Sequence, residues 1–358
     1  MLLIAGMAIL ATTRAVQAGG QVRTIDLTGA PIATITEPLV FPAGFNELPG
    51  NRAVVIDQKD NRLALVNFTN GSSADLGRHG GGPNEFQRID KAFPWPGGAT
   101  LVPDPANNRA LVISAGGDLS SADYSRQTIG VAGAGQIGGA DRAGKLYVYG
   151  VAPGQGGQDS LPIIRWDPVS HRTDTLAWWP IARVIVGTPR MVNGRMQATL
   201  SNTSLFPDRG AWRVLPAGGV TVVHPSPYRI ELVDAAGRHH FGPIVARERI
   251  PIDGAEIAAW NAQGRPLTRA DVPPSYPPFV GSNDVFVAPD GGVWVERSRR
   301  VADSTAVYDV FDTNGRLAAQ ARLRPNSRII GIGTRNIYIV RQTTDDDFWH
   351  LEQWRRPN

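Results

Sequence analysis

The amino-acid sequence predicts an all-β fold, a six-bladed β-propeller whose ring is closed when an N-terminal strand completes the last blade. Three observations lead to this prediction. Glycine (40 residues) and proline (28 residues) are abundant in the 358-residue chain, and helix-period apolar stretches are rare; this combination is typical of β folds with many turns. A unit of strands and tight turns recurs six times along the chain. The sixth copy lacks its outer strand, and a segment near the N-terminus can supply one.

Each repeat unit opens with a tight turn, because glycine and asparagine adopt the positive φ that hairpin turns need. These turns lie at 49–51, 96–98, 142–144, 217–219, 289–292 and 334–336. An apolar strand follows each turn, at 53–57, 100–103, 146–149, 220–224, 293–296 and 337–341. A second strand comes next, at 61–68, 108–113, 161–167, 228–234, 306–312 and 348–355.

Several of these strands are apolar on both faces, as at 54–56 and 337–340. Such a strand must be covered on both sides, which happens when neighbouring blades stack against each other. One unit cannot bury both faces alone, so the units are expected to pack radially around an axis.

The last unit ends with the chain, soon after the strand at 348–355, and so has no outer strand of its own. Residues 22–27 alternate between polar and apolar side chains, and a turn at 28–30 and a further segment at 31–35 follow. We expect this N-terminal stretch to complete the sixth blade and remove the open sheet edge.

Residues 77–86 read Gly-Arg-His-Gly-Gly-Gly-Pro-Asn-Glu-Phe. This segment resembles the G-R-x-G-x-G-P-x-E-F signature of bacterial exported six-bladed propellers related to NHL repeats. Asp57 with Asn61 and Arg62 is similar to the NHL turn, as are 290–295 and 308–312. The resemblance spans most of residues 22–355. It implies a propeller outside the cytoplasm, of a type that usually serves as a binding platform.

The first eighteen residues are predicted to be a signal peptide, and 19–358 a single propeller domain with insertions at about 180–210 and 245–280. Residues 2–11 are apolar but too short to span a bilayer, and 16–18 (Val-Gln-Ala) fit a signal-peptidase site. We therefore expect the protein in the periplasm or outside the cell. The chain has no cysteine, which excludes disulfides, thiol nucleophiles and cysteine zinc sites.

The formal net charge of +4 is too small to argue for nucleic acid, and we expect a monomer without a nucleic-acid partner. Among the 36 basic residues only Lys59, Lys91 and Lys145 are lysines. Arginine binds carboxylates and phosphates in bidentate fashion, although genome composition also accounts for its abundance. The partner expected from these features is an anionic glycan or a protein.

A ligand is expected where outer strands connect to the next inner strands, because such connections gather on one face of a propeller. The loop at 78–86 and both insertions are connections of this kind. The second insertion contains a capping box at 253–256 that predicts a helix over 257–263, and a proline-rich strap at 273–278. The candidate ligand-binding residues are Arg78, His79, Glu85, Trp178, Trp179, Arg183, Arg190, Trp260 and Tyr276.

Structural interpretations of the same residues stay open. In the loop at 78–86 the glycines permit a sharp path, Glu85 can satisfy backbone N–H groups, and Phe86 can fill the space between blades. The tryptophans of the insertions can simply pack them onto the ring.

No catalytic or metal-binding residues are predicted. The G-x-G-x-x-G match at 133–138 lacks the helix that a dinucleotide site needs. His239 and His240 are adjacent, so on a strand they point to opposite faces and cannot easily share a metal. No cofactor is expected; calcium at Asp345–Asp347 is the weak exception, and a solvated turn is the favoured interpretation there.

Two functions therefore remain in view. The favoured one is a non-catalytic ligand- or protein-binding scaffold. The alternative is a metal-dependent hydrolase similar to lactonase-type six-bladed propellers, with its site at the channel mouth. Resemblance to those enzymes implies a metal-binding glutamate near Glu37, but the glycine expected between Glu37 and Pro38 is absent.

Overall fold

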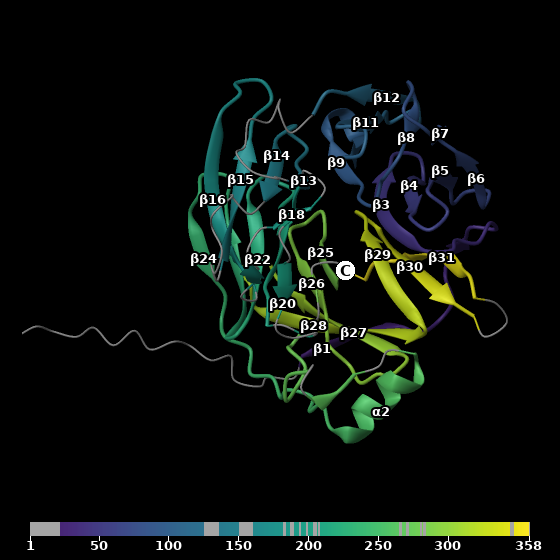
Figure 1. Cartoon of the computed structure of the whole chain (residues 1–358). Coiled ribbons are helices and arrows are strands. Elements are labelled where there is room, and N and C mark those ends of the chain that lie inside the picture. Colours follow the sequence, from purple (N-terminus) through teal and green to yellow (C-terminus); the bar gives the residue numbers. More distant parts are fainter. Residues whose placement is uncertain are drawn as a thin grey trace, which may run out of the picture.

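The chain forms six β-sheets that surround a central axis (Figure 1). This computed structural model describes residues 22–124, 136–149, 160–181, 184–186, 190–192, 195–197, 200–202, 206, 208–264, 267–269, 272–279, 281, 284–343 and 347–357. Each innermost strand contacts the innermost strand of the next sheet, and these contacts close a complete circle. The predicted six-bladed β-propeller is therefore confirmed.

Blades 1 to 3 each contain four antiparallel strands. From the inside outwards these are β3 (Pro42–Leu48), β4 (Arg52–Asp57), β5 (Arg62–Asn67) and β6 (Ser72–Asp75); β9 (Phe93–Trp95), β10 (Ala99–Asp104), β11 (Arg109–Ile113) and β12 (Leu119–Ala122); and β13 (Gln136–Ala140), β14 (Leu146–Tyr149), β15 (Ser160–Trp166) and β16 (Thr173–Pro180). A 3₁₀ turn, η1 (Pro96–Gly98), joins β9 to β10.

Blades 4 to 6 are built in the same way, but blade 5 has a fifth strand. Their strands are β21 (Ala211–Val214), β22 (Val220–Pro225), β23 (Tyr228–Val233) and β24 (His239–Phe241); β25 (Val285–Val287), β26 (Val293–Glu296), β27 (Thr305–Phe311), β28 (Leu317–Pro325) and β1 (Arg23–Leu27); and β29 (Ser327–Ile332), β30 (Asn336–Gln342), β31 (Trp349–Arg355) and β2 (Ala33–Thr34).

Small elements lie in three of the connections from an outer strand to the next inner strand. The first holds the parallel pair β7 (Arg78–His79) and β8 (Glu85–Phe86). The second holds β17 (Val184–Val186) paired with β20 (Leu200–Asn202), and β18 (Arg190–Val192) paired with β19 (Arg195–Gln197). The third holds α2 (Gly254–Ala262), where the Asp253 carboxylate accepts the N–H of Glu256 at 2.9 Å, so the predicted capped helix is confirmed.

The N-terminal segment closes the ring, and it does so on two blades. Strand β2 is the outermost strand of blade 6, where Ala33 pairs with Gln353 of β31. Strand β1 instead runs parallel to β28 on the outside of blade 5, with Ile25 opposite Ala321. The sequence predicted the closure but not this additional strand, because a lone parallel edge strand carries no turn signal that identifies its partner.

The hydrophobic core lies between the blades, as the doubly apolar strands predicted. Six clusters of buried residues each join two consecutive blades, from blades 1 and 2 around to blades 6 and 1. Blades 6 and 1 meet through Tyr338 and Phe45, whose ring centroids are 4.4 Å apart. Stacking thus covers both faces of each central strand.

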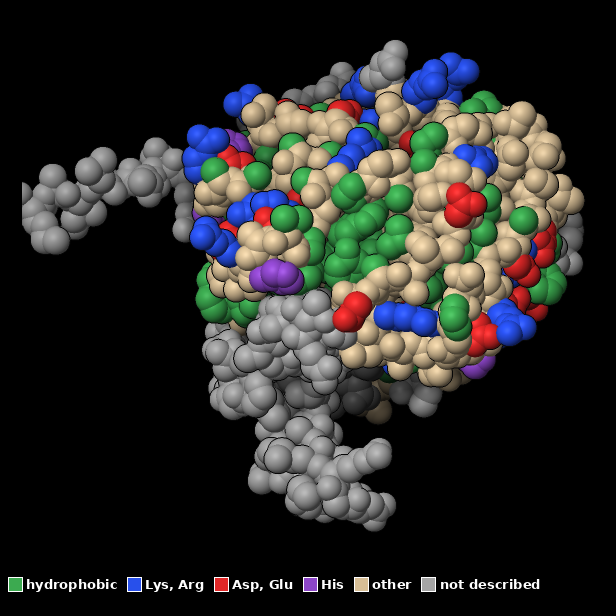
Figure 2. Space-filling view, turned by 90° about the horizontal axis from the view of Figure 1, so that it is seen from above, with side chains coloured by type: hydrophobic (Ala, Val, Ile, Leu, Met, Phe, Trp, Pro, Cys, Tyr) green, Lys and Arg blue, Asp and Glu red, His purple; other side chains and the backbone are tan. Residues whose placement is uncertain are grey.

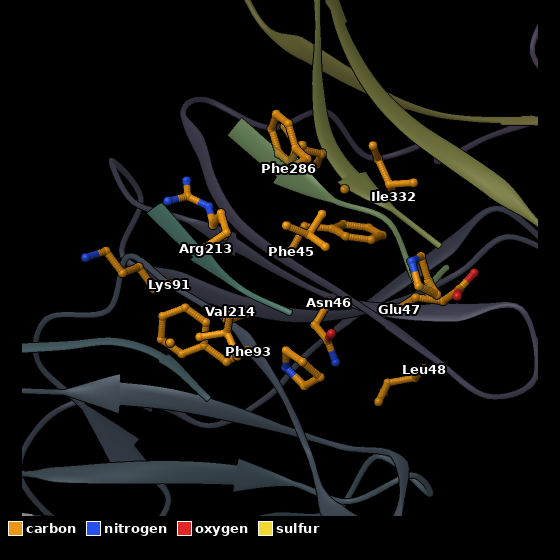
Figure 3. A pocket seen from close by; sticks show the side chains of 18 of the residues that line it. Phe45, Asn46, Glu47, Leu48, Lys91, Phe93, Arg213, Val214, Phe286 and Ile332 are labelled. Carbon is orange, nitrogen blue, oxygen red and sulfur yellow. The ribbon is translucent and has the colours of Figure 1, made fainter. Parts of the chain in front are cut away.

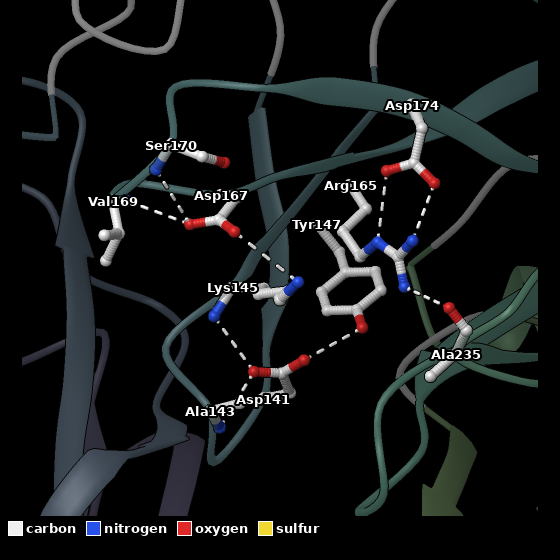
Figure 4. Close-up of polar contacts among 10 residues, drawn as sticks. All are labelled: Asp141, Ala143, Lys145, Tyr147, Arg165, Asp167, Val169, Ser170, Asp174 and Ala235. Atoms are coloured by element: carbon white, nitrogen blue, oxygen red, sulfur yellow. Dashed lines mark hydrogen bonds and ion pairs between the residues drawn. The ribbon is translucent and has the colours of Figure 1, made fainter.

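Buried tyrosine hydroxyls add polar contacts across three of these interfaces. The Tyr147 hydroxyl accepts the N–H of Gly219 in blade 4 at 2.9 Å. Beside it, Arg165 donates to the Ala235 carbonyl at 2.7 Å (Figure 4). The Tyr308 hydroxyl accepts the N–H of Ile329 in blade 6 at 3.0 Å. The Tyr338 hydroxyl donates to Glu47 of blade 1 at 2.6 Å.

Replacing Tyr338 with phenylalanine is expected to lower the free energy of unfolding by about 1–3 kcal/mol, because the Glu47 carboxylate loses a partner in a half-buried site. Chemical denaturation of the two proteins measures the difference. Tyr149→Phe is the control, since among the described residues the Tyr149 hydroxyl makes an exposed 3.3 Å contact with Gln136. An equal loss of unfolding free energy in the two variants would show that the Tyr338–Glu47 hydrogen bond is not the cause.

Candidate functional site

A cavity of about 1300 Å³ occupies the axis of the ring. The inner strands of all six blades line it, and Phe45, Phe93, Val214, Phe286 and Ile332 surround the same space (Figure 3). It reaches from the connections before the inner strands, at Asp90 and Lys91, to the hairpin turns after them, at Gly97 and Pro289. We call the first end, where the long connections also lie, the entrance.

Aromatic side chains make up much of the wall. The lining aromatics are Phe41, Phe45, Phe93, Trp95, Tyr149, Trp179, Trp212, Phe286 and Trp349. Tyr149 makes edge-on contacts with Trp179 and Trp212, at centroid distances of 5.3 and 5.8 Å. In the space-filling view, hydrophobic side chains gather near the middle of one face, and Lys and Arg lie mostly toward its margin (Figure 2). Such a wall offers flat apolar surfaces on which a ring can stack.

The charged residues of the wall are mainly basic. Six basic side chains line the cavity, namely Lys91, Arg142, Arg213, Arg328, Arg335 and Arg355, against the acidic Glu47, Asp90 and Asp141. Glu47 is bonded to Tyr338, and Asp141 accepts the N–H groups of Ala143 and Lys145 in its own turn. The positive charges are therefore only partly balanced within the wall.

Three of the basic residues come to the entrance from three different blades. Lys91 precedes β9, and its ammonium lies 5.7 Å from the centre of the Tyr149 ring. Arg213 lies on β21, where burial lowers its pKa to about 10. Arg328 lies on β29, donates to the Pro42 carbonyl and sits 5.0 Å from the centre of the Trp349 ring.

Burial also lowers the pKa of Arg328. For both arginines the direction of the shift means that the protein environment solvates the charged form less well than water does. An anion in the cavity would restore part of that lost stabilisation.

Asp284 stands immediately before β25 at the same end of the ring. Burial, followed by the charge of Glu296, raises its pKa to about 7, and Arg213 opposes this shift. Glu296 accepts a hydrogen bond from the Tyr308 hydroxyl at 2.7 Å and pairs with Arg299. Asp284 itself does not line the cavity, whereas Arg213, which opposes the rise of its pKa, does.

The glycine-rich loop at 78–86 is held mainly by its own side chains. Glu85 accepts the N–H of Gly82 at 2.6 Å and pairs with Arg78 at 2.7 Å, and these two contacts lower the pKa of Glu85. Gly80 has a φ of +156°, a conformation that L side chains rarely adopt, so that position favours glycine. Phe86 is buried between blades 1 and 2, as the structural interpretation predicts.

Arg78 and His79 are exposed residues of this loop. Arg78 is 82% exposed, and His79 lines a small cleft with Gln58, Asn61 and Arg88. The structure does not bring Arg78, His79 and Glu85 to the channel wall, because none of the three lines the cavity.

Trp260 and Tyr276 belong to a small core inside the second insertion. The Trp260 indole donates to the Tyr276 hydroxyl at 2.5 Å, and this hydroxyl donates to the buried Glu256 at 2.8 Å. Burial raises the pKa of Tyr276 to about 12. Ile252 and Val272 complete the core. These contacts hold the insertion together and leave Tyr276 only 2% exposed.

The remaining predicted residues lie in or near the first insertion. Trp179 lines the cavity and donates to the Gly210 carbonyl at 2.6 Å, whereas Trp178 is 53% exposed. Arg183 lies outside the described residues, and Arg190 is described only as part of the backbone of β18. Among the predicted ligand-binding residues whose side chains are described, only Trp179 lines the channel.

The channel-lining residues at the entrance that sequence reasoning missed are Lys91, Arg213 and Arg328. Each lies within three residues of the start of an inner strand. Their position near the start of an inner strand could have identified them from the sequence, because inner strands face the axis in every blade.

The other sequence motifs take structural positions. Residues 136–138 of the glycine motif lie in β13, and residues 133–135 lie outside the described residues. His239 contacts Glu231, whereas His240 contacts the Asn314 carbonyl of blade 5, so the two rings do point apart as predicted. Glu37 pairs with Arg62 and is half-exposed, and it does not line the channel.

Acidic and histidine side chains are the candidate metal ligands of this cysteine-free chain. In the part of the chain that the structure describes, no group of three or more of them is arranged to hold a metal ion. Asp345 and Asp346 lie outside that part. No described helix is long and apolar enough to cross a membrane. The predicted signal peptide also falls outside the described residues.

No protein-family model and no curated protein matches this chain. Similar solved structures include a member of the DUF4221 family from Bacteroides vulgatus, at 8% identity and a TM-score of 0.50, covering 91% of this chain and 94% of that one. An exported protein from Bacteroides fragilis is 11% identical with a TM-score of 0.48, covering 93% and 99%. A gluconolactonase from Xanthomonas campestris is 9% identical with a TM-score of 0.46, covering 89% and 88%.

At these identities the likeness concerns the fold alone. Together with the six blades of the structure, it agrees with the resemblance to bacterial propellers that the loop at 77–86 indicated. The chain is a six-bladed β-propeller, and the residues that line its channel are the basis for its proposed function.

Proposed function

We propose that this protein is an exported, non-catalytic binding propeller that takes an acidic glycan at the entrance of its channel. One observation carries the proposal: Lys91, Arg213 and Arg328 come from three blades to one end of an aromatic-lined cavity. Export rests on the predicted signal peptide at 1–18.

The chemistry of the wall suits this class of ligand. Guanidinium groups bind carboxylates through paired hydrogen bonds, and aromatic rings pack against the apolar faces of sugar rings. Arg213 and Arg328 are half-buried and lose hydration in the ligand-free protein, so an anion would compensate them directly. Because the site lies on inner strands of a rigid ring, its groups are already in place before binding.

Trigalacturonate is expected to bind, and its affinity should fall at least about tenfold between 50 and 300 mM NaCl, because two or more charge contacts form. Calorimetry measures the affinity. The methyl-esterified trisaccharide, which has the same rings without the charge, is expected to bind more weakly and without the salt dependence. Arg328→Met should weaken binding of the acid.

Arg238→Met is the matched control, since Arg238 is 84% exposed and pairs with Asp234 on the outside of blade 4. Equal affinity for the acid and its ester would remove the proposal.

The alternative is a metal-dependent hydrolase, and one observation favours it: Asp284 and Glu296 place two carboxyl groups near the entrance. The described residues do not supply the third ligand that a metal site needs, and Glu37 lies elsewhere. Stoichiometric calcium or zinc in protein purified without chelators would favour the hydrolase over the binding scaffold.

A further inference from the structure

A polar cleft of about 500 Å³ lies at the entrance end of blades 1 and 2. Three connections form its walls: the turn between β4 and β5, the glycine-rich loop, and the segment that leads to β9. Its lining residues are Gln58, Asp60, Asn61, His79, Gln87, Arg88 and Ile89. A space of this size falls within the range of about 300–1,000 Å³ that is typical of ligand sites.

The cleft adjoins the channel. Gln58 lines both spaces, and the segment 87–92 passes from one to the other, with residues 87–89 in the cleft and residues 90–92 in the channel wall. Phe41 stands at the channel side of this boundary, where it is 50% exposed and its carbonyl accepts the N–H of Gln58 at 2.9 Å. A chain-like ligand that leaves the channel past Phe41 therefore meets the cleft next.

The polar side chains of the cleft are available to a ligand. In the part of the chain that the structure describes, none of the six forms a hydrogen bond or an ion pair with the protein. The three amide side chains each offer a donor and an acceptor, which suits the neighbouring hydroxyl groups of a sugar. Arg88 and His79 add donors for a carboxylate, and Asp60 adds an acceptor for hydroxyls.

Buried contacts hold the walls of the cleft in place. The fully buried Asp104 accepts the N–H groups of Gln87 and Arg88 at 3.3 and 3.1 Å. Arg109 donates to the Gly82 carbonyl of the glycine-rich loop at 2.7 Å, and β7 of that loop packs against β5 (Figure 1). A ligand thus enters a preformed cleft and loses little affinity to the ordering of loops.

We propose that this cleft is a second subsite, which binds the sugars that follow those held in the channel, so that the ligand is an extended acidic oligosaccharide. The inference rests on the proposed function and adds the length of the ligand. It also gives the glycine-rich loop a part in binding, because that loop carries His79. The second contact forms within an existing complex, so it raises the affinity for long chains only.

A comparison of hexagalacturonate with trigalacturonate tests the second subsite by calorimetry. Wild type is expected to bind the hexasaccharide at least about twentyfold more tightly than the trisaccharide. A single subsite gains only about fourfold from the several ways in which a hexasaccharide can place three consecutive sugars in it. A larger gain requires contacts beyond the channel.

Variants of the two subsites are expected to behave differently. The double variant His79→Ala/Arg88→Ala removes the charged donors of the cleft, so the affinity ratio of the two oligosaccharides should fall to about fourfold. Arg328→Met, in the channel, should weaken both oligosaccharides by the same factor and keep the wild-type ratio. Arg238→Met, on the outside of blade 4, is the control and should change neither affinity.

The His79 ring gives a direct readout in the wild-type protein. Its Cε1–H signal in NMR spectra should shift when hexagalacturonate binds and stay in place with trigalacturonate. His171, which is exposed in the turn between β15 and β16, is the control and should respond to neither.

Three results would overturn the second subsite alone: a wild-type ratio of about fourfold or less, a large ratio that persists in the double variant, or a His79 signal that ignores the hexasaccharide. In each of these cases trigalacturonate still binds, and the channel keeps its proposed function. If neither oligosaccharide binds, the glycan function fails and the second subsite falls with it.

Discussion

Removal of residues 22–36 is expected to yield a protein that aggregates or melts at least about 10 °C below the full-length chain. The deletion takes away β1 and β2, and with them the buried side chains of Ile25, Leu27 and Ile35. Burying each of these side chains stabilises the folded protein by roughly 2 kcal/mol. The three contributions together approach the whole free energy of unfolding of an ordinary domain. The loss also opens the edges of two sheets, which favours association between chains. Light scattering and thermal melting measure both effects.

A graded set of truncations identifies the cause. A chain that starts at residue 22 should melt like the full-length protein, one that starts at 29 loses only β1, and one that starts at 37 loses both strands. A synthetic peptide of residues 22–36 should bind the shortest chain and raise its melting temperature. If the chain starting at 37 melts normally, these strands do not hold the ring closed.

Gly331→Ala is expected to lower the free energy of unfolding by about 3 kcal/mol or more, the upper range for an overpacked core. A Cβ on Gly331 would lie 2.1 Å from Cδ1 of Phe45. The Phe45 ring is confined by Tyr338 and lines the channel, so it cannot move aside without disturbing both. Chemical denaturation measures the loss, and weaker ligand binding should accompany it.

A second substitution tests whether the contact with Phe45 is the reason. Phe45→Leu in the Gly331→Ala background should cost less than the two single changes added together, because the smaller side chain makes room for the new methyl group. Gly29→Ala is the control, since no atom lies within 4 Å of the added Cβ there. Additive losses would show that another contact is responsible.

The turns and the strand pattern were sufficient to predict the architecture. Gly50, Gly144, Gly218 and Gly291 all adopt positive φ in the predicted turns, and that requirement is visible in the sequence as glycine. The apolar character of segments such as 337–340 revealed that both faces are covered. Blade number, ring closure and the capped helix therefore followed from local rules.

The candidate site could be predicted only in part, because it depends on which side chains meet across the axis. Lys91, Arg213 and Arg328 are separated by more than 100 residues in sequence, and no motif links them. Conspicuous residues such as Trp260 and Tyr276 instead build the core of an insertion. Richness in aromatic residues could not distinguish a binding wall from a packed interior.

The pairing of the N-terminal strands with the last two blades has a consequence for how the protein is made. Residues 23–34 are synthesised about 300 residues before their partners in β28 and β31. Contacts so distant in sequence form slowly. Closure of the ring is therefore expected to be a late step of folding, after the blades between these strands have been made.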